Sequence, residues 1–137
     1  MKIENIKFKA KRLDNGEWVE GDLSHDFEGG FGISAVSEEN GMVGFSGYFK
    51  VFLSTVCQFT GLTDMKGREI WEHDYITDYP NCGEVIYVDG GFAMHSNVGD
   101  LSLEQFVDRV EGSPLGTYGK CLVTNQGSIF DRKEGEV

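Results

Sequence analysis

The residues of this sequence that could do chemistry are mostly carboxylates, since 23 of its 137 residues are acidic. Several of them lie close together, for example Glu69 with Glu72 and Asp74 with Asp78. Such pairs work as a general acid and a general base when burial and neighbouring charges shift their pKa values. At this acidic content, close pairs also arise from composition alone. Their spacing therefore predicts no catalytic residue.

Histidines beside carboxylates are the second candidate, because both kinds of side chain bind metal ions. Glu72, His73 and Asp74 are adjacent in the sequence, and His25 and His95 could converge with them in space. Successive residues of a strand point to opposite faces, so one tripeptide does not present three ligands to one ion. The spacing also matches none of the short metal-binding motifs. We therefore predict a solvated turn here and no metal site.

The thiols of Cys57, Cys82 and Cys121 are the third candidate. They are odd in number, widely spaced and without a CxxC pair, which is typical of reduced thiols in a cytoplasm and not of a zinc site. Cys57 belongs to the apolar run YFKVFLSTVCQF and is predicted to be a core residue. The sequence has no GxSxG elbow, and the glycines at 29–32 lack the lysine of a phosphate-binding loop. It therefore predicts no catalytic nucleophile and no cofactor.

Charge is distributed unevenly along the chain, whose formal net charge is −11. No lysine or arginine occurs in residues 14–48, which include eight acidic residues, or in residues 69–108, which include nine. Five of the twelve basic residues lie within the first twelve positions. Because binding to phosphates depends on Lys and Arg, this balance argues against nucleic acid as a partner.

A basic strip near the N-terminus consists of Lys7, Lys9, Lys11 and Arg12. Phe8 alternates with the lysines, which predicts a half-buried strand with the ring on the core side and the charges on the other. Lysines on an edge strand would block unwanted pairing. The strip could equally contact an acidic face of a neighbouring subunit and assemble copies head to tail. We expect a homo-oligomer with this strip as a subunit contact.

The elements that position these residues are predicted to be short antiparallel strands. Nineteen glycines punctuate short apolar runs, a pattern that indicates a mainly β protein. Hairpin turns are indicated at 14–16 and 89–91, because Asn and Gly accept positive φ. The other expected elements are a long hairpin or an irregular excursion over 24–47, one buried strand over 48–59, one short helix near 102–110 capped by Ser102, and final strands at 120–124 and 128–130.

The most distinctive block is QFTGLTDMKGREIWEHDYI, residues 58–76. Asp64 and Gly67 are predicted to form a tight turn before a strand at 69–71, with the Asp64 side chain accepting hydrogen bonds from backbone amides two residues on. Gly61 is a further turn former. Asp74 is predicted to brace the adjoining loop in the same manner as Asp64. The residue types of this block therefore indicate structure and not catalysis.

A family resemblance rests on the order of five pieces, namely IKFKA, Trp18 before Glu20 and Gly21, the central block, GEVIYVDGGF and GSIFD. This order resembles the YopX family over nearly the whole chain. The resemblance implies coiled antiparallel sheets with an SH3-like barrel portion. It also implies a phage or prophage gene, a tendency to self-assemble and no established activity.

The same resemblance implies a single YopX-like domain. Its parts are an N-terminal β portion at 1–57, the barrel portion at 58–131 and a tail at 132–137. This chain has His73 where the family usually has glycine, so we expect a backbone near positive φ at that residue. The stretch at 24–47 is longer than is typical, so its role is specific to this protein.

Three functions from different classes remain open at this point. The first is a phage-type accessory protein that acts through protein–protein contacts with an unknown partner in a bacterial cytoplasm. The second is an acidic decoy that binds a host nucleic-acid-binding protein, and the third is a carboxylate- or metal-dependent hydrolase. No apolar run approaches the roughly 18 residues of a membrane helix, and the start has no secretory signal, so no membrane is expected. We prefer the first function and expect no enzymatic activity.

Overall fold

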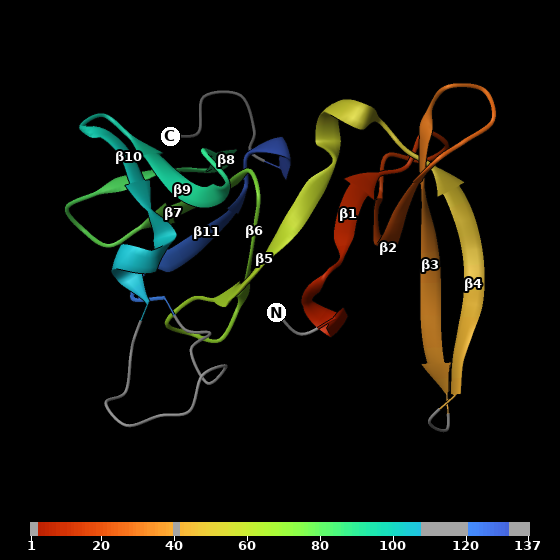
Figure 1. Ribbon diagram of the computed structural model, residues 1–137, viewed down its shortest axis with the longest axis horizontal. Coiled ribbons are helices and arrows are strands. Elements are labelled where there is room, and N and C mark those ends of the chain that lie inside the picture. The colour runs from red at the N-terminus through yellow and green to blue at the C-terminus, as the bar shows by residue number, and fades with distance from the viewer. Residues whose placement is uncertain (1–2, 40–41, 108–120, 132–137) are drawn as a thin grey trace. The chain divides into compact units, whose positions relative to one another are not determined.

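Antiparallel β-sheet makes up most of the structure, and the mainly β prediction is confirmed (Figure 1). The computed structural model describes residues 3–39, 42–107 and 121–131. The chain divides into two compact units, one of Lys2–Gln58 and one that begins at Phe59. Within the described residues the sheets stay open, so the barrel portion implied by the family resemblance is not a closed barrel. None of the described helices is long and apolar enough to cross a membrane.

Two successive hairpins build the first unit. In sheet order its strands are β4 (Met42–Lys50), β3 (Phe31–Glu39), β2 (Trp18–His25) and β1 (Phe8–Lys11). The turn between β1 and β2 contains Gly16 at φ 72°, and the Asn15 side chain accepts a hydrogen bond from the Glu17 amide at 2.9 Å. The predicted first hairpin is therefore confirmed. Of the two expectations for 24–47, the structure shows the long hairpin.

The core of the first unit lies on one face of β1. Ala10 is fully buried, whereas its neighbours Lys9 and Lys11 are on the opposite face, where they contact the Trp18 ring. The predicted alternation of this strand is therefore confirmed. The members of this core are the buried Ala10, Ile33 and Val51, together with the partly buried Phe8, Val19, Leu23, Phe31 and Val56.

The single buried strand predicted over 48–59 is wrong. β4 ends at Lys50, a 3₁₀ helix follows at Leu53–Thr55, and β5 is Cys57–Thr63. The Thr55 hydroxyl donates to the Phe52 carbonyl at 2.7 Å and accepts from the Lys11 amide at 2.9 Å, so it holds the chain in a turn. Phe52 therefore remains 45% exposed despite its apolar side chain.

β1 is flanked by strands on both sides. It pairs with β2 along its whole length and with β5 through Phe8 opposite Gln58 and Lys9 opposite Cys57. The edge-strand explanation for the lysines is therefore wrong, because β1 has no open edge to protect.

The second unit contains a five-stranded antiparallel sheet. In sheet order its strands are β10 (Gly99–Ser102), β9 (Gly91–Ser96), β8 (Cys82–Val88), β7 (Asp74–Thr77) and β11 (Thr124–Ser128). Asp89 and Gly90 join β8 to β9 with φ values of 51° and 81°, as in a tight two-residue hairpin turn. The predicted hairpin at 89–91 is therefore confirmed. The short strand β6 (Glu69–Trp71) pairs with β5.

A second hydrophobic core fills this unit. Its fully or almost fully buried members are Ile70, Ile76, Val85, Met94, Leu103, Cys121 and Val123. The short helix expected near 102–110 is a 3₁₀ helix, Leu103–Phe106, and the Ser102 hydroxyl accepts a hydrogen bond from the Glu104 amide. Residues 108–110 lie outside the described residues.

The C-terminal elements differ from the two short strands predicted at 120–124 and 128–130. One strand, β11, runs through the gap between them, and a 3₁₀ helix, Ile129–Asp131, follows. Asn125, in this strand, is held by hydrogen bonds from its backbone amide to Asp64 and from its side chain to Asp74. No local sequence pattern predicts these distant contacts. Lys120 and the tail at 132–137 lie outside the described residues.

Candidate functional site

Asp64 organises the turn between β5 and β6. Its carboxylate is fully buried and accepts hydrogen bonds from the amides of Lys66 and Arg68 and from the distant Asn125 amide, all at 2.9 Å. The Arg68 guanidinium adds an ion pair at 3.0 Å. The predicted turn, with Gly67 at φ 80°, is therefore confirmed.

The environment of Asp64 keeps its carboxyl group ionised. Burial by itself raises the pKa, but the amides of Asn125, Arg68 and Lys66 and the Arg68 side chain together lower the pKa below its ordinary value. Hydrogen bonds to the charged form have this effect. A carboxylate fixed in this state accepts hydrogen bonds and is a poor proton donor.

Asp74 is only 2% exposed and has a similar bracing role. One of its oxygens accepts from the Trp71 amide at 2.9 Å and from the Asn125 side-chain amide at 2.7 Å. The Asn125 side-chain amide also donates to the Glu69 carbonyl at 2.9 Å. Asn125 therefore connects both predicted aspartates, through its backbone amide to Asp64 and through its side chain to Asp74.

The sequence does not predict the role of Asn125 as a hydrogen-bond donor to the two aspartates. Asn125 lies 61 residues from Asp64, and nothing in its neighbourhood, TNQGS, distinguishes it from an ordinary turn residue. The only available signal is that two buried carboxylates need donors that the central block does not itself supply. That signal does not identify the donor.

Two backbone positions in the central block have left-handed conformations besides Gly67. Gly61 has φ 82° and lies at an irregularity in the β5–β6 pairing, between Phe59 and Leu62. His73 has φ 69°, so the positive φ expected there is confirmed. Its backbone amide donates to the Val85 carbonyl at 2.7 Å and its carbonyl accepts from the Ile129 amide at 2.9 Å, which hold this conformation in place.

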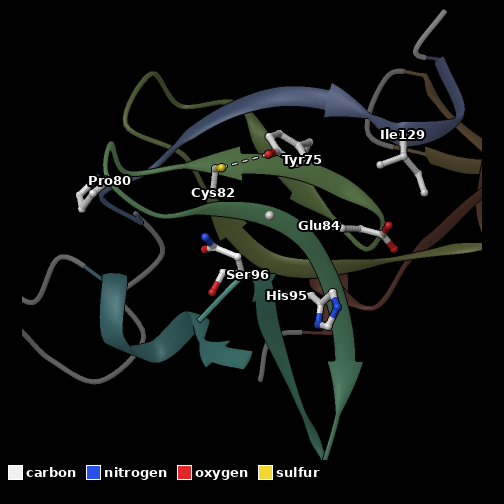
Figure 2. Close-up of a pocket in the computed structure, with 9 residues that line it drawn as sticks. Tyr75, Pro80, Cys82, Glu84, His95, Ser96 and Ile129 are labelled. Carbon is white, nitrogen blue, oxygen red and sulfur yellow. Dashed lines mark hydrogen bonds between the residues drawn. The ribbon is translucent and has the colours of Figure 1, made fainter. Parts of the chain in front are cut away.

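An open groove of about 660 Å³ lies on the outer face of the five-stranded sheet (Figure 2). A row of polar side chains crosses it in register, with Tyr75 opposite Glu84, Glu84 opposite His95, and His95 opposite Asp100. Figure 2 shows the hydrogen bond from the Tyr75 hydroxyl to Cys82, at 3.0 Å. Sequence reasoning missed this row because it depends on the register of four strands.

The two acidic groups of this polar row are paired with histidines. Glu84 lies 2.8 Å from the Nδ1 atom of His73, and Asp100 lies 2.6 Å from the Nδ1 atom of His95. His25 belongs to the first unit, where its ring contacts Phe31. Among the described residues, no group of three or more His, Cys, Asp or Glu side chains has a geometry that could hold a metal ion.

The thiols differ in accessibility. Cys57 and Cys121 are fully buried, and Cys82 is exposed. Burial raises the pKa of the Cys121 thiol to about 11. At neutral pH Cys121 is therefore a protonated core side chain and not a nucleophile.

The basic strip lies on the solvent side of the first sheet, and its cations have local partners. Lys7 forms an ion pair with Glu20 at 3.1 Å. The ammonium groups of Lys9 and Lys11 lie 4.6 and 5.3 Å from the centre of the Trp18 ring. Arg12 pairs with Asp14 at 2.5 Å and lies 4.1 Å from the centre of the Phe49 ring. Lys9 and Lys11 therefore share one aromatic side chain, and Arg12 lies on a second.

Comparison with known families settles the relationship. A family model described as YopX protein matches residues 7–113. The chain belongs to the YopX family. The match to the YopX model includes the whole central block, with the Asp64 turn and the His73 position, and the basic strip from its first lysine onward. No curated protein and no solved structure is similar enough to this YopX-family chain to count as a match.

Proposed function

We propose that this YopX-family protein is a phage- or prophage-type accessory protein that acts through protein–protein contacts and self-assembles in a bacterial cytoplasm. The observation that supports this most directly is the basic strip around Trp18, in a chain whose net charge is −11. Cations stacked on an indole ring form a rigid, amphipathic contact surface. The surrounding negative charge makes a second copy an electrostatically suitable partner.

The cations of the strip are held by neighbouring side chains. Lys7 forms an ion pair with Glu20, and Arg12 forms one with Asp14. Lys9 and Lys11 lie over the Trp18 ring, whose face attracts cations. The strip concentrates basic side chains in an otherwise acidic chain, so it is the position at which an acidic face of a second copy would be attracted.

The buried reactive groups of the second unit support contacts rather than catalysis. Asp64 and Asp74 are fixed acceptors in a buried hydrogen-bond network, and the Cys121 thiol is buried. A catalytic acid or nucleophile must reach a substrate and change its protonation state. These groups are placed to do neither. We expect no nucleic-acid binding, because the excess of carboxylates repels phosphates.

Light scattering across a range of salt concentrations tests the proposal. The expected result is an oligomer at low ionic strength whose mass falls as salt rises and the strip contact weakens, because exposed charges are screened within about 10 Å at 0.1 M salt. Lys9→Gln should weaken the assembly. Lys66→Gln removes the same charge from an exposed position in the Asp64 turn and is the matched control. A protein that is monomeric at every concentration and salt level would refute self-assembly.

A further inference from the structure

The hairpin of β3 and β4 extends beyond the strand that supports it. β2 pairs with β3 only through residues 31–34, opposite 22–25. From Val36 to Glu39, β3 pairs with β4 alone among the described strands. In Figure 1 this end of the hairpin runs past β2. We call residues 36–39 and 42–46 the β-arm.

A two-stranded ribbon of this kind is an unusual feature in a folded unit. An isolated hairpin is at best marginally stable in water, and a third strand or a packed layer normally supports it. Each outer edge of the ribbon also presents backbone N–H and C=O groups that are not used within the pair. The β-arm therefore has the geometry of an element that is completed by an added strand.

Charge distinguishes the two edges of the β-arm. The β3 side ends in Glu38 and Glu39, which repel another acidic chain. The β4 side, Met42–Lys50, reads MVGFSGYFK and has no charged residue before Lys50. It also lacks the charges and prolines with which exposed edge strands usually avoid pairing. The edge of β4 is therefore the one suited to accept a strand.

At the Lys50 end, the outer edge of β4 already forms hydrogen bonds with another segment of the same chain. The Lys50 carbonyl accepts a hydrogen bond from the Leu13 amide at 2.9 Å, and Arg12 forms a bridge with Val51. No described strand pairs with that edge over the residues before Lys50. The segment left for a partner is about eight residues, a normal length for a β-strand.

We propose that β4 pairs antiparallel with β4 of a second copy of this chain, which joins two first-unit sheets into one. An antiparallel pair of identical strands has two-fold symmetry, so the contact closes on itself and leaves no further β4 edge open. Two chains of net charge −11 repel each other, and an uncharged strand is where this repulsion is least. This inference rests on the self-assembly in the proposed function and names a contact distinct from the basic strip.

Sedimentation velocity on the full chain tests the β4 contact with two matched variants. Val43→Lys places a charge on β4, and Val36→Lys places the same charge on β3 in the same hairpin. We expect Val43→Lys to weaken dimerisation at least tenfold and Val36→Lys to change it less than threefold. Circular dichroism must show both variants folded to the wild-type extent. Equal weakening by both substitutions would overturn the assignment to β4.

The sign of the salt dependence separates this contact from the basic strip. Salt screens the repulsion between two acidic chains, so a β4–β4 dimer should become tighter as salt rises. A strip bound to an acidic face should become weaker. Hydrogen exchange gives an independent readout, because amides in β4 should gain protection as protein concentration rises and amides in β3 should not. Assembly that is lost in salt and unaffected by Val43→Lys would refute the β4 contact and leave the strip proposal standing.

Discussion

Replacing Asn125 by alanine should be among the most destabilising single substitutions in the second unit. The side chain donates to the Asp74 carboxylate at 2.7 Å and to the Glu69 carbonyl at 2.9 Å, and its oxygen accepts from the Gly127 amide at 2.8 Å. A buried hydrogen bond to a charged group contributes about 1.5–3 kcal/mol, and each neutral one about 1 kcal/mol. The expected loss in the free energy of unfolding is therefore about 3.5–5 kcal/mol.

Urea unfolding followed by tryptophan fluorescence measures this loss, because Trp71 lies next to the affected network. Asn97→Ala is the matched control. It removes the same side chain from the exposed turn between β9 and β10 and should change the free energy of unfolding by less than about 0.5 kcal/mol. A loss below about 1 kcal/mol for Asn125→Ala would mean that water replaces the missing donor, and the reasoning on the network would be wrong.

Three further predictions follow from the same contacts. The pKa of Asp64 is lower in the folded state than its ordinary value of 3.8, so its ionised form stabilises the fold above pH 3.8, and this stability is lost as pH falls through the lowered pKa. Asp64→Asn should therefore flatten the acid limb of a plot of unfolding free energy against pH. An unchanged acid limb would contradict this role of Asp64. At His73, φ 69° disfavours a β-branched residue, so His73→Val should be about 1–2 kcal/mol less stable than His73→Asn in thermal unfolding, and equal stabilities would argue against backbone strain. A thiol reagent should modify Cys82 in the native protein but should reach Cys57 and Cys121 only on unfolding, as mass spectrometry after timed labelling would show.

The sequence predicted local features of the fold well. The turns at Gly16, at Gly67 and at Asp89 were found because each needs particular residue types within a few positions. The alternation of β1 was read from a period of two. Positive φ at His73 came from the family resemblance, because a position usually occupied by glycine signals a backbone constraint.

Features that depend on pairing between distant segments were not predicted. The bond from the Asn125 amide to Asp64, the pairing of β1 with β5 and the polar row of the groove all require a strand register that no local pattern specifies. The error over 48–59 has a related cause. Apolar β-branched residues indicated one strand, but the contact between Thr55 and Lys11 turned the chain away from that course.

The long sequence separation between Asn125 and the two aspartates has a consequence for synthesis. Asp64 and Asp74 are translated well before the residue that supplies their remaining donor. Until β11 emerges from the ribosome, closing the second unit would bury two carboxylates with incomplete hydrogen bonding, at a cost of several kcal/mol. The unit should therefore remain open until β11 has emerged, so that a nascent chain terminated before β11 is left accessible to proteases.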